Sequence, residues 1–175
     1  VEDPDQIAYL PEKFDPPWFL TGEKFIRFSL GLYKKKISKG EMLKALESVS
    51  FNPDFLNKSV HKNSKGMRQK LGILASVITE CPLLILDEPM SGLDPSARAH
   101  VKDILRDVLK AGRTIFFSSH ILADMEEICD DVSLMHDGKI LVQDTPSAFV
   151  QSTKSQNLER AFLKTIQNYT PSFTP

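Results

Sequence analysis

The second half of the chain alternates short apolar runs with longer amphipathic stretches, a pattern typical of an α/β fold. Residues 83–86 are all aliphatic, as a strand covered on both faces requires. A second apolar strand is predicted over 114–118. The stretch between them, 96–111, has helical periodicity and ends at Gly112. Strand, helix and strand in this order predict a parallel core sheet.

Towards the end of the chain the pattern changes to a hairpin and short helices. Strands are expected over 132–135 and 139–143, joined by a turn at 137–138. We expect this hairpin to form an antiparallel edge of the core sheet. A threonine and a proline at 145–146 predict the start of a further helix. A last amphipathic helix is expected over 158–166.

The first half of the chain predicts a mainly α-helical lobe. A short strand is expected over 7–10, where a proline stops it. Thr21 can cap a helix whose apolar side chains Phe25, Phe28, Leu32 and Tyr33 share one face, and a second helix follows Gly40. Ser64 can begin the next helix, which carries an apolar stripe.

Composition excludes some classes of partner without identifying a function. The 175 residues carry a net charge of −1, so no broad field favours nucleic acid or an anionic membrane. Cys81 and Cys129 are too few for a disulfide framework, and we expect buried free thiols in a reducing compartment. No apolar stretch approaches the roughly 20 residues that span a bilayer, so any membrane span must come from another polypeptide.

Two adjacent carboxylates at the end of the first core strand are the leading candidates for chemistry. Side chains alternate along a strand, so Asp87 and Glu88 face different directions where the strand ends. One carboxylate can then hold a metal while the other handles a proton, as phosphoryl transfer from a nucleotide requires. By themselves, the two residues are explained equally well by a core strand followed by an acidic turn.

Three flanking segments favour the nucleotide site. Residues 91–94, Ser91-Gly92-Leu93-Asp94, follow at once, residues 63–69 open a helix upstream, and the apolar strand at 115–117 ends in Ser118-Ser119-His120. In this order the segments resemble the ATPase subunit of ABC transporters, and the resemblance covers nearly the whole chain. It implies a P-loop NTPase-like α/β fold, with a partial parallel core sheet and a mainly α-helical subdomain. It also implies ATP and Mg²⁺ as cofactors.

The resemblance assigns roles around the two carboxylates. Asp87 falls on the Walker B aspartate, which is expected to hold Mg²⁺ through a coordinated water. Glu88 falls on the adjacent catalytic glutamate, a general base or the group that orients the attacking water. His120 falls on the switch histidine, whose neutral imidazole can donate to the γ-phosphate. Ser91 and Asp94 fall in the D-loop, which ties one ATP site to the other.

The resemblance also places Ser64, Lys65, Gly66 and Met67 on a divergent form of the LSGGQ signature motif, similar to that of ABC-2 exporters. Exposed N–H groups at a helix N-terminus favour an anion, and the motif is expected to contact the γ-phosphate held by the opposite subunit. Glu12 takes the place of the Q-loop glutamine. Its carboxylate can ligate Mg²⁺ but cannot donate a hydrogen bond as an amide does.

Structural alternatives stay open for these residues. Ser64 is equally explained as an ordinary helix N-cap, and Lys65 as a solvent-facing side chain. Ser91 and Asp94 also make good turn chemistry before a helix. A capping or satisfied histidine is the usual explanation of a lone His, but the placement of His120 after the Walker B segment and one intervening helix favours the switch role. Trp18, in the lobe expected to meet a membrane subunit, is as consistent with core packing as with a contact anchor.

The phosphate loop of this family, GxxxxGKS or GxxxxGKT, occurs nowhere in the chain. Without its amides and lysine, the β- and γ-phosphates lose their main cradle. We therefore expect a fragment that binds MgATP weakly, hydrolyses it negligibly and leaves an open sheet edge or apolar face. Its expected parts are a strand end and Q-loop at 1–11, a helical subdomain at 12–62, the signature helix and RecA-like core at 63–152, and a C-terminal helix and tail at 153–175.

The sequence thus predicts the ATP-hydrolysing subunit of an ABC-2-like exporter, cytoplasmic and peripheral at the cytoplasmic face of the membrane. The expected partners are a second ATPase subunit, identical or different, and an integral membrane permease; nucleic acid is not expected. A non-transport ABC ATPase is an alternative, although no coiled-coil insertion or tandem ATPase domain is present in the sequence. A catalytically silent interaction module is another, against which Glu88 and His120 argue.

Overall fold

The structure, a computed structural model, describes residues 6–48 and 51–169, and the chain divides into two compact units between Ser119 and His120. No helix in these ranges is long and apolar enough to cross a membrane. The first unit contains β1 (Ile7–Leu10), α1 (Gly22–Leu32), α2 (Lys39–Ser48), η2 (Pro53–Asn57), η3 (Val60–Lys62), α3 (Lys65–Ile78), β2 (Leu83–Leu86), α4 (Pro95–Lys110) and β3 (Thr114–Phe117). The second contains α5 (Leu122–Ile128), β4 (Val132–His136), β5 (Lys139–Asp144), α6 (Pro146–Ser152) and α7 (Leu158–Asn168).

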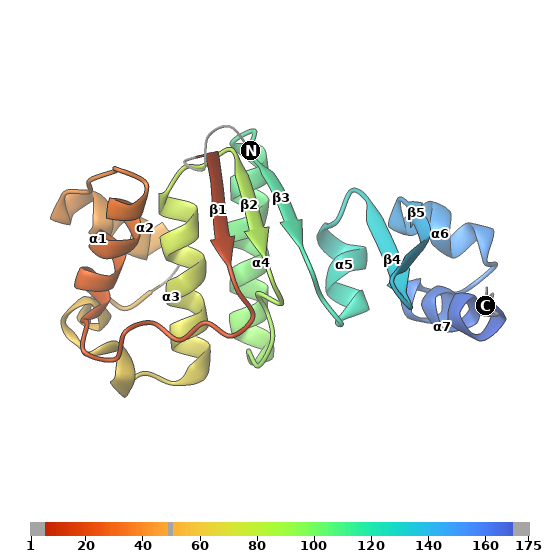
Figure 1. Cartoon of the computed structure of the whole chain (residues 1–175), viewed down its shortest axis with the longest axis horizontal. Coiled ribbons are helices and arrows are strands. Elements are labelled where there is room, and N and C mark those ends of the chain that lie inside the picture. Colours follow the sequence, from red (N-terminus) through yellow and green to blue (C-terminus); the bar gives the residue numbers. More distant parts are fainter. Residues whose placement is uncertain (1–5, 49–50, 170–175) are drawn as a thin grey trace. The chain divides into compact units, whose positions relative to one another are not determined.

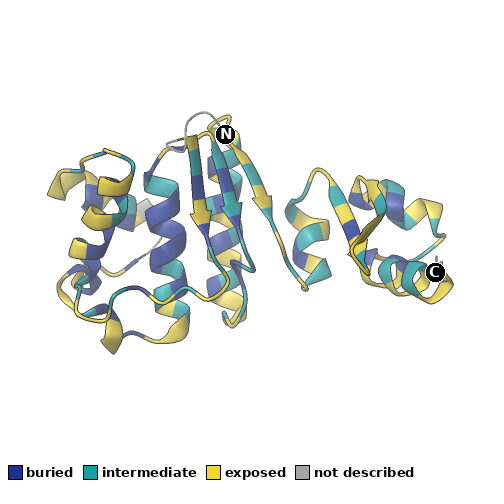
Figure 2. Cartoon of the chain, viewed as in Figure 1, coloured by how far each residue is buried: buried dark blue, intermediate teal, exposed yellow. Residues whose placement is uncertain are grey.

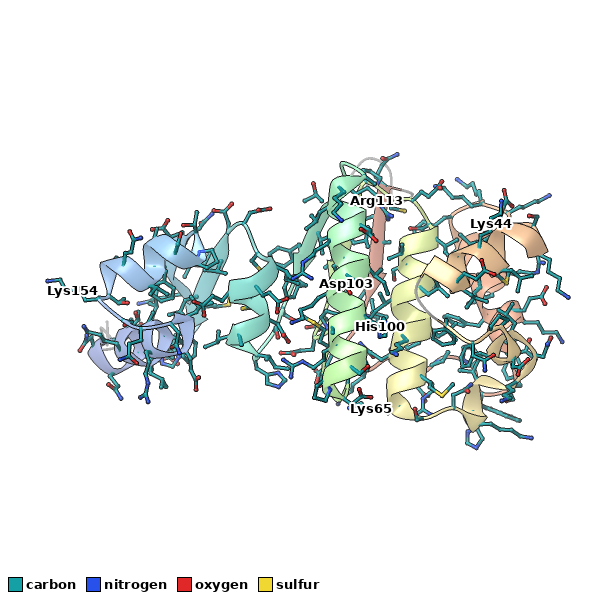
Figure 3. All side chains as sticks on the ribbon, turned by 180° about the vertical axis from the view of Figure 1, so that it is seen from behind. Lys44, Lys65, His100, Asp103, Arg113 and Lys154 are labelled. Atoms are coloured by element: carbon teal, nitrogen blue, oxygen red, sulfur yellow. The ribbon has the colours of Figure 1, made fainter. Side chains whose placement is uncertain are left out.

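A three-stranded parallel sheet in the order β1-β2-β3 forms the centre of the first unit. In the central strand, Leu84 pairs with Ala8 of β1 and with Ile115 of β3. Helices α3 and α4 cover one face of this sheet, where Leu84 and Leu86 are buried (Figures 1 and 3). The predicted fold class, a partial parallel sheet with a mainly α-helical subdomain, is confirmed.

The other face of this sheet carries an exposed apolar row. Tyr9, Ile85 and Phe116 lie side by side in the register of the three strands. The outer two are 56% and 67% exposed, and Figure 2 shows the strands partly in the colour of exposed residues. A sheet face of this kind agrees with the apolar surface that the sequence led us to expect.

Buried aromatic and aliphatic side chains hold the helical lobe together. Thr21 caps α1 as predicted, and its hydroxyl accepts from the Lys24 N–H at 3.3 Å. The predicted apolar face of α1 is wrong in part, because Phe28 and Leu32 are exposed. Residues three and four apart share a helix face. The buried residues of α1 are Gly22, Phe25, Ile26 and Leu30, so the packed face shares only Phe25 with the predicted one. The lobe core contains Phe25, Ile26, Leu30, Met42, Leu46, Phe51, Phe55, Leu56, Val60, Leu71, Leu74 and Ala75.

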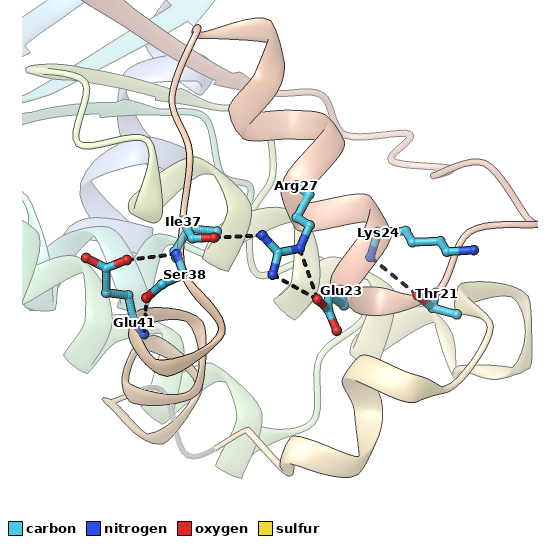
Figure 4. Close-up of polar contacts among 7 residues, drawn as sticks. All are labelled: Thr21, Glu23, Lys24, Arg27, Ile37, Ser38 and Glu41. Carbon is cyan, nitrogen blue, oxygen red and sulfur yellow. Dashed lines mark hydrogen bonds and ion pairs between the residues drawn. The ribbon is translucent and has the colours of Figure 1, made fainter.

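Polar contacts fix the connection between α1 and α2 (Figure 4). Arg27 donates from Nη1 to the Ile37 carbonyl at 2.7 Å. Ser38 and Glu41 form a reciprocal capping box, with Ser38 N–H to Glu41 Oε2 at 2.8 Å and Glu41 N–H to Ser38 Oγ at 3.2 Å. These bonds lower the pKa of the Glu41 carboxyl. Because of the box, α2 includes Gly40 instead of following it as predicted.

Two glycines of α1 give a matched test of close packing. We expect Gly22→Ala to lower the free energy of unfolding by about 1–3 kcal/mol, because a Cβ there would lie 2.8 Å from the Phe55 carbonyl oxygen. Gly31→Ala should raise it by about 0.5–1 kcal/mol, because nothing lies within 4 Å of that position and alanine favours the helix. Urea unfolding measures both. Equal effects of the two substitutions would contradict the packing described here.

The second unit is a hairpin packed against short helices. Strands β4 and β5 turn at Asp137 and Gly138, which have φ values of 48° and 71°, as the expected tight turn requires. Leu134, Phe149 and Leu158 are buried in its core. The prediction that the hairpin extends the parallel sheet is wrong for the described residues, since β4 and β5 form a separate two-stranded sheet. Leu134 is buried within the hairpin's own unit, with Val132, Leu141 and Val142 packed against it, whereas Met135 and Ile140 are exposed.

Both cysteines are free, as predicted; Cys81 is buried and Cys129 is half-buried. Burial, followed by the charge of Asp130, raises the pKa of Cys129 to about 11. The thiolate is the reactive form, so native Cys129 should react with iodoacetamide at pH 8 about 100-fold more slowly than the same thiol in urea. The difference should shrink as the pH rises towards 11. Peptide mass spectrometry can follow the reaction, and equal rates in the two states at pH 8 would contradict the assignment.

Candidate nucleotide site

Asp87 and Glu88 lie directly beyond β2, at the carboxyl edge of the parallel sheet. The Asp87 N–H donates to the Leu10 carbonyl at 2.8 Å, which continues the pairing with β1 past the end of the strand. From the other neighbouring strand, Ser118 donates from Oγ to Asp87 Oδ1, and its Oγ accepts from the Glu88 N–H at 3.0 Å. The two acidic residues are therefore fixed from both sides of the central strand.

Glu88 has a left-handed backbone, with a φ of 47°. A non-glycine residue in this conformation costs about 1–2 kcal/mol, and the surrounding bonds must hold it. Here the Glu88 N–H donates to Ser118 Oγ, and the Glu88 carbonyl accepts from the Ser91 N–H at 3.1 Å; these two bonds hold the residue in place. Glu80, before β2, has a similar φ of 54°, so the conformation alone does not identify a functional residue.

Asp87, at the end of a core strand, could hold a magnesium ion that is shared with a nucleotide. Mg²⁺ in such sites takes one or two carboxylates and completes its shell with water and phosphate oxygens. Among the residues that the structure describes, no group of three or more His, Cys, Asp or Glu could hold a metal. An ion held by Asp87 would therefore have to complete its shell with water and phosphate oxygens. Glu12 is exposed in the loop after β1 and is not gathered into a metal cluster with them.

The signature-like segment lies at the start of α3. Ser64 is the N-cap of this helix, and its Oγ accepts from the Met67 N–H at 3.2 Å. The capping role that the sequence left open is thus present, while contact with a phosphate stays a prediction. Met67 is 37% exposed, and Lys65, labelled in Figure 3 at the start of α3, is exposed too.

This segment packs against the D-loop-like turn. A Cβ placed on Gly92 would lie 3.4 Å from Lys65 Nζ and 3.6 Å from its Cε, so the lysine side chain passes over the glycine. A Cβ placed on Gly66 would lie 3.3 Å from Leu93 Cδ2. Gly92 also has a φ of 71°, which favours glycine. The two predicted motifs are therefore neighbours within one subunit, and Lys65 is not simply solvated.

Asp94 is the N-cap of α4, and its carboxylate accepts from the Ala97 N–H at 2.9 Å. This hydrogen bond lowers the pKa of Asp94. The structural role that the sequence offered for Asp94, in a turn before a helix, is therefore present in the structure. Any contact of Ser91 and Asp94 with a second subunit stays a prediction.

His120 is the first residue of the second unit, whereas Asp87 and Glu88 belong to the first. No contact between the imidazole and these carboxylates is therefore described. Its proposed role at a phosphate stays a prediction. Ser118 is the residue that the sequence reasoning missed. Its position directly after the third strand was the available signal, because carboxyl ends of neighbouring parallel strands meet at one edge of the sheet.

Comparison with known proteins places this geometry in a family. Residues 23–123, more than half of the chain, match the family model described as "AAA domain, putative AbiEii toxin, Type IV TA system". The fluoroquinolones export ATP-binding protein of Mycobacterium tuberculosis is 39% identical over 128 residues, which cover 73% of this chain and 42% of the relative. The bacitracin transport ATP-binding protein of Enterococcus faecalis is 38% identical over 123 residues, covering 70% and 39%. The chain belongs to the AAA domain family, and its homologues are ATP-binding proteins of ABC transporters.

Solved structures agree with this membership. An ATP-binding subunit of an ABC transporter superposes with a TM-score of 0.79 at 28% identity, covering 93% of this chain and 69% of that one. A dimeric ATP-binding cassette bound to ADP and Pi superposes at 0.72 with 18% identity, covering 81% and 63%, and so shows the fold alone. Membership of the ABC ATPases implies an ATP-binding site, typically with Mg²⁺. The chain spans about two-fifths of the length of the two curated relatives.

Proposed function

We propose that the whole protein to which this chain belongs is the ATP-hydrolysing subunit of an ABC exporter. The observation that carries the proposal is the Asp87–Glu88 pair beyond the central strand, tied by Ser118 to the neighbouring strand. The names of two relatives, a fluoroquinolones export protein and a bacitracin transport protein, favour the export direction. In this proposal the subunit works at the cytoplasmic face of the membrane, next to an integral membrane permease.

In the proposed mechanism Asp87 would hold a magnesium ion, and Glu88 would orient the attacking water or take its proton. The ion, when bound with ATP, neutralises charge that develops on the phosphates. Ser118 keeps Asp87 in one orientation, so no reorganisation of this carboxylate is needed during the reaction. His120 donates to the γ-phosphate, and Glu12 lies near the metal as the Q-loop residue.

The rest of the ATP site comes from outside these residues. We propose that another part of the whole protein supplies the phosphate loop and covers the exposed row of Tyr9, Ile85 and Phe116. A row of large apolar side chains on one sheet face is suited to burial under a further layer of structure. The 175-residue chain alone is therefore expected to bind MgATP weakly and to turn it over negligibly.

A second subunit completes each site in this proposal. Ser64, Lys65, Gly66 and Met67 of one subunit reach the γ-phosphate held by the other, while Ser91 and Asp94 connect the two sites. The shared packing of Lys65 over Gly92 supports this, since it lets the two segments move together.

A subunit-mixing experiment on the whole protein tests the composite site. Ser64→Arg and Asp87→Asn should each abolish MgATP hydrolysis, because each substitution damages both ATP sites of a dimer of two identical variant subunits. A one-to-one mixture should regain roughly a quarter of wild-type activity, because half of the dimers are mixed and each of these has one intact site.

The matched control mixes Asp87→Asn with Glu88→Gln. Both changes lie in the same half of the proposed site, so every site of every dimer is damaged and no activity should return. Restored activity in the control, or none in the first mixture when mixed dimers are shown to form, would overturn the proposal.

A further inference from the structure

A groove of about 520 Å³ lies in the first unit, between the helical lobe and the ends of α3 and α4. It is lined by residues of the lobe, such as Leu30 and Ile37, and by residues of the core, such as Val77, Val108 and Arg113. Arg113 directly precedes β3, so the groove lies at the amino edge of the sheet. Asp87 and Glu88 follow β2 at the opposite edge, which separates this groove from the nucleotide site.

The Arg113 guanidinium is only partly hydrogen-bonded. Its Nε donates to the Cys81 carbonyl at 2.8 Å and its Nη1 to the Val77 carbonyl at 2.9 Å. The third nitrogen, Nη2, is buried and has no hydrogen-bond partner among the described residues. Burial also lowers the pKa of this side chain. A buried, positively charged donor without an acceptor is costly, and an anion at this position would relieve that cost.

The acidic side chains along the groove do not neutralise Arg113 by direct contact. Asp107 pairs with Lys110 at 3.0 Å, and the Glu41 carboxylate accepts from the Ser38 N–H. Glu80 lies 4.0 Å from Lys35, and its side chain is 82% exposed. Its charge still acts on Arg113 from a distance.

Lys35 and Lys36 bring further positive charge to the groove. Lys35 donates to the Thr79 carbonyl, and its Nζ has the ion pair with Glu80 already described. Lys36 lines the groove on the side of the lobe. The groove is therefore lined by three cations, Lys35, Lys36 and Arg113, and by three carboxylates, Glu41, Glu80 and Asp107, of which Asp107 is paired with Lys110 and Glu80 with Lys35.

The remaining wall is aliphatic. Leu30, Ile37, Val77, Ile78, Ile104 and Val108 line it. A cavity of a few hundred cubic ångströms with apolar walls and a few polar groups is typical of a small-molecule site. The combination of such walls with one unsatisfied guanidinium selects a ligand that has a single anionic head and an aliphatic tail.

We propose that this groove binds a small aliphatic carboxylate, with its head on Arg113 Nη2 and its tail against the aliphatic wall. Nη2 is covered in the structure, so the head must displace a flexible side chain as it enters. Lys35 and Glu80, which line the same groove, have long side chains, and that of Glu80 is 82% exposed. The ligand would bridge the helical lobe and the core.

Binding of octanoate to the full 175-residue chain, measured by isothermal titration calorimetry without nucleotide, tests the proposal. Octanoate should bind at least about 10-fold more tightly than 1-octanol, which has the tail without the charge, and than acetate, which has the charge without the tail. Arg113→Gln should weaken octanoate binding by about 10-fold or more. Ala111→Trp, at an exposed position that lines the groove, should abolish binding by filling it.

Lys44→Gln is the matched control, because Lys44 is an exposed cation of the lobe that does not line the groove (Figure 3). It should bind octanoate as the wild type does. Equal binding of octanoate and 1-octanol would overturn the proposal, as would unchanged binding by folded Ala111→Trp, which would place the ligand elsewhere, for example on the exposed sheet face. If Arg113→Gln fails to fold, the Ala111→Trp result decides. No nucleotide is present, so this outcome is independent of the proposed ATPase function.

Discussion

Glu88→Gln in the whole protein is expected to reduce the rate of MgATP hydrolysis by about 10²–10⁴-fold while leaving nucleotide binding nearly unchanged. Removal of a positioned general base or water-orienting carboxylate has effects of that size. Glutamine keeps the shape of the side chain. The hydrogen bonds that hold residue 88 run from its N–H to Ser118 Oγ and from the Ser91 N–H to its carbonyl, so they do not depend on the carboxylate. Phosphate release measures the rate, and a fluorescent nucleotide measures the affinity.

Glu80→Gln is the matched control for this prediction. Glu80 flanks the same strand at its other end and has the same left-handed backbone, with a φ of 54° against 47° for Glu88. The two substitutions therefore make the same chemical change in the same local conformation. Hydrolysis should stay at the wild-type rate in Glu80→Gln. A similar loss in both variants would mean that Glu88 acts through stability, not chemistry.

Phe55→Ala is expected to lower the free energy of unfolding by about 3–5 kcal/mol, the range for a large aromatic removed from a core. Phe55 is 1% exposed, and its ring meets that of Phe51 at a centroid distance of 4.4 Å. Gly22 packs directly against it, so α1 would lose its support from η2. Urea unfolding followed by circular dichroism measures the change.

Phe19→Ala provides the comparison, since it deletes the same side chain where it is 65% exposed. The centroid of its ring lies 5.8 Å from that of Trp18, which is exposed too, so little apolar surface is buried there. The loss should stay within about 0.5 kcal/mol, as for most surface substitutions. A comparable loss in the two variants would show that the lobe does not have the core described for it.

The starts of three helices could be predicted from residues that lie close together in the sequence. Thr21, Ser64 and Asp94 each accept a hydrogen bond from an N–H three residues ahead, so a short stretch of sequence is enough to place them. The face of α1 that is buried was harder to predict. Both of its faces are rich in apolar residues. Contacts of α1 with η2 and α3 decided that Phe25 is buried and that Phe28 is exposed.

In the candidate site, too, features formed by neighbouring residues were predicted and contacts between distant segments were not. The Asp87–Glu88 pair at the end of an aliphatic strand was evident from the order of residues, and so was the D-loop-like turn. The contact of Ser118 with that pair was not predicted, since it joins residues 31 positions apart. The passage of Lys65 over Gly92 was likewise unforeseen, because it depends on how α3 packs beside α4.

By itself, the sequence determined the strands, the capped helix starts and the family of this chain, because each depends on residues a few positions apart or on motifs in a fixed order. Only the tertiary structure decided which residues meet across the sheet and between the helices. Ser118 reached Asp87, and Arg113 came to line a groove with an unsatisfied nitrogen, through the pairing and packing of distant segments. Such contacts are set by geometry in three dimensions, which periodicity along a chain does not encode.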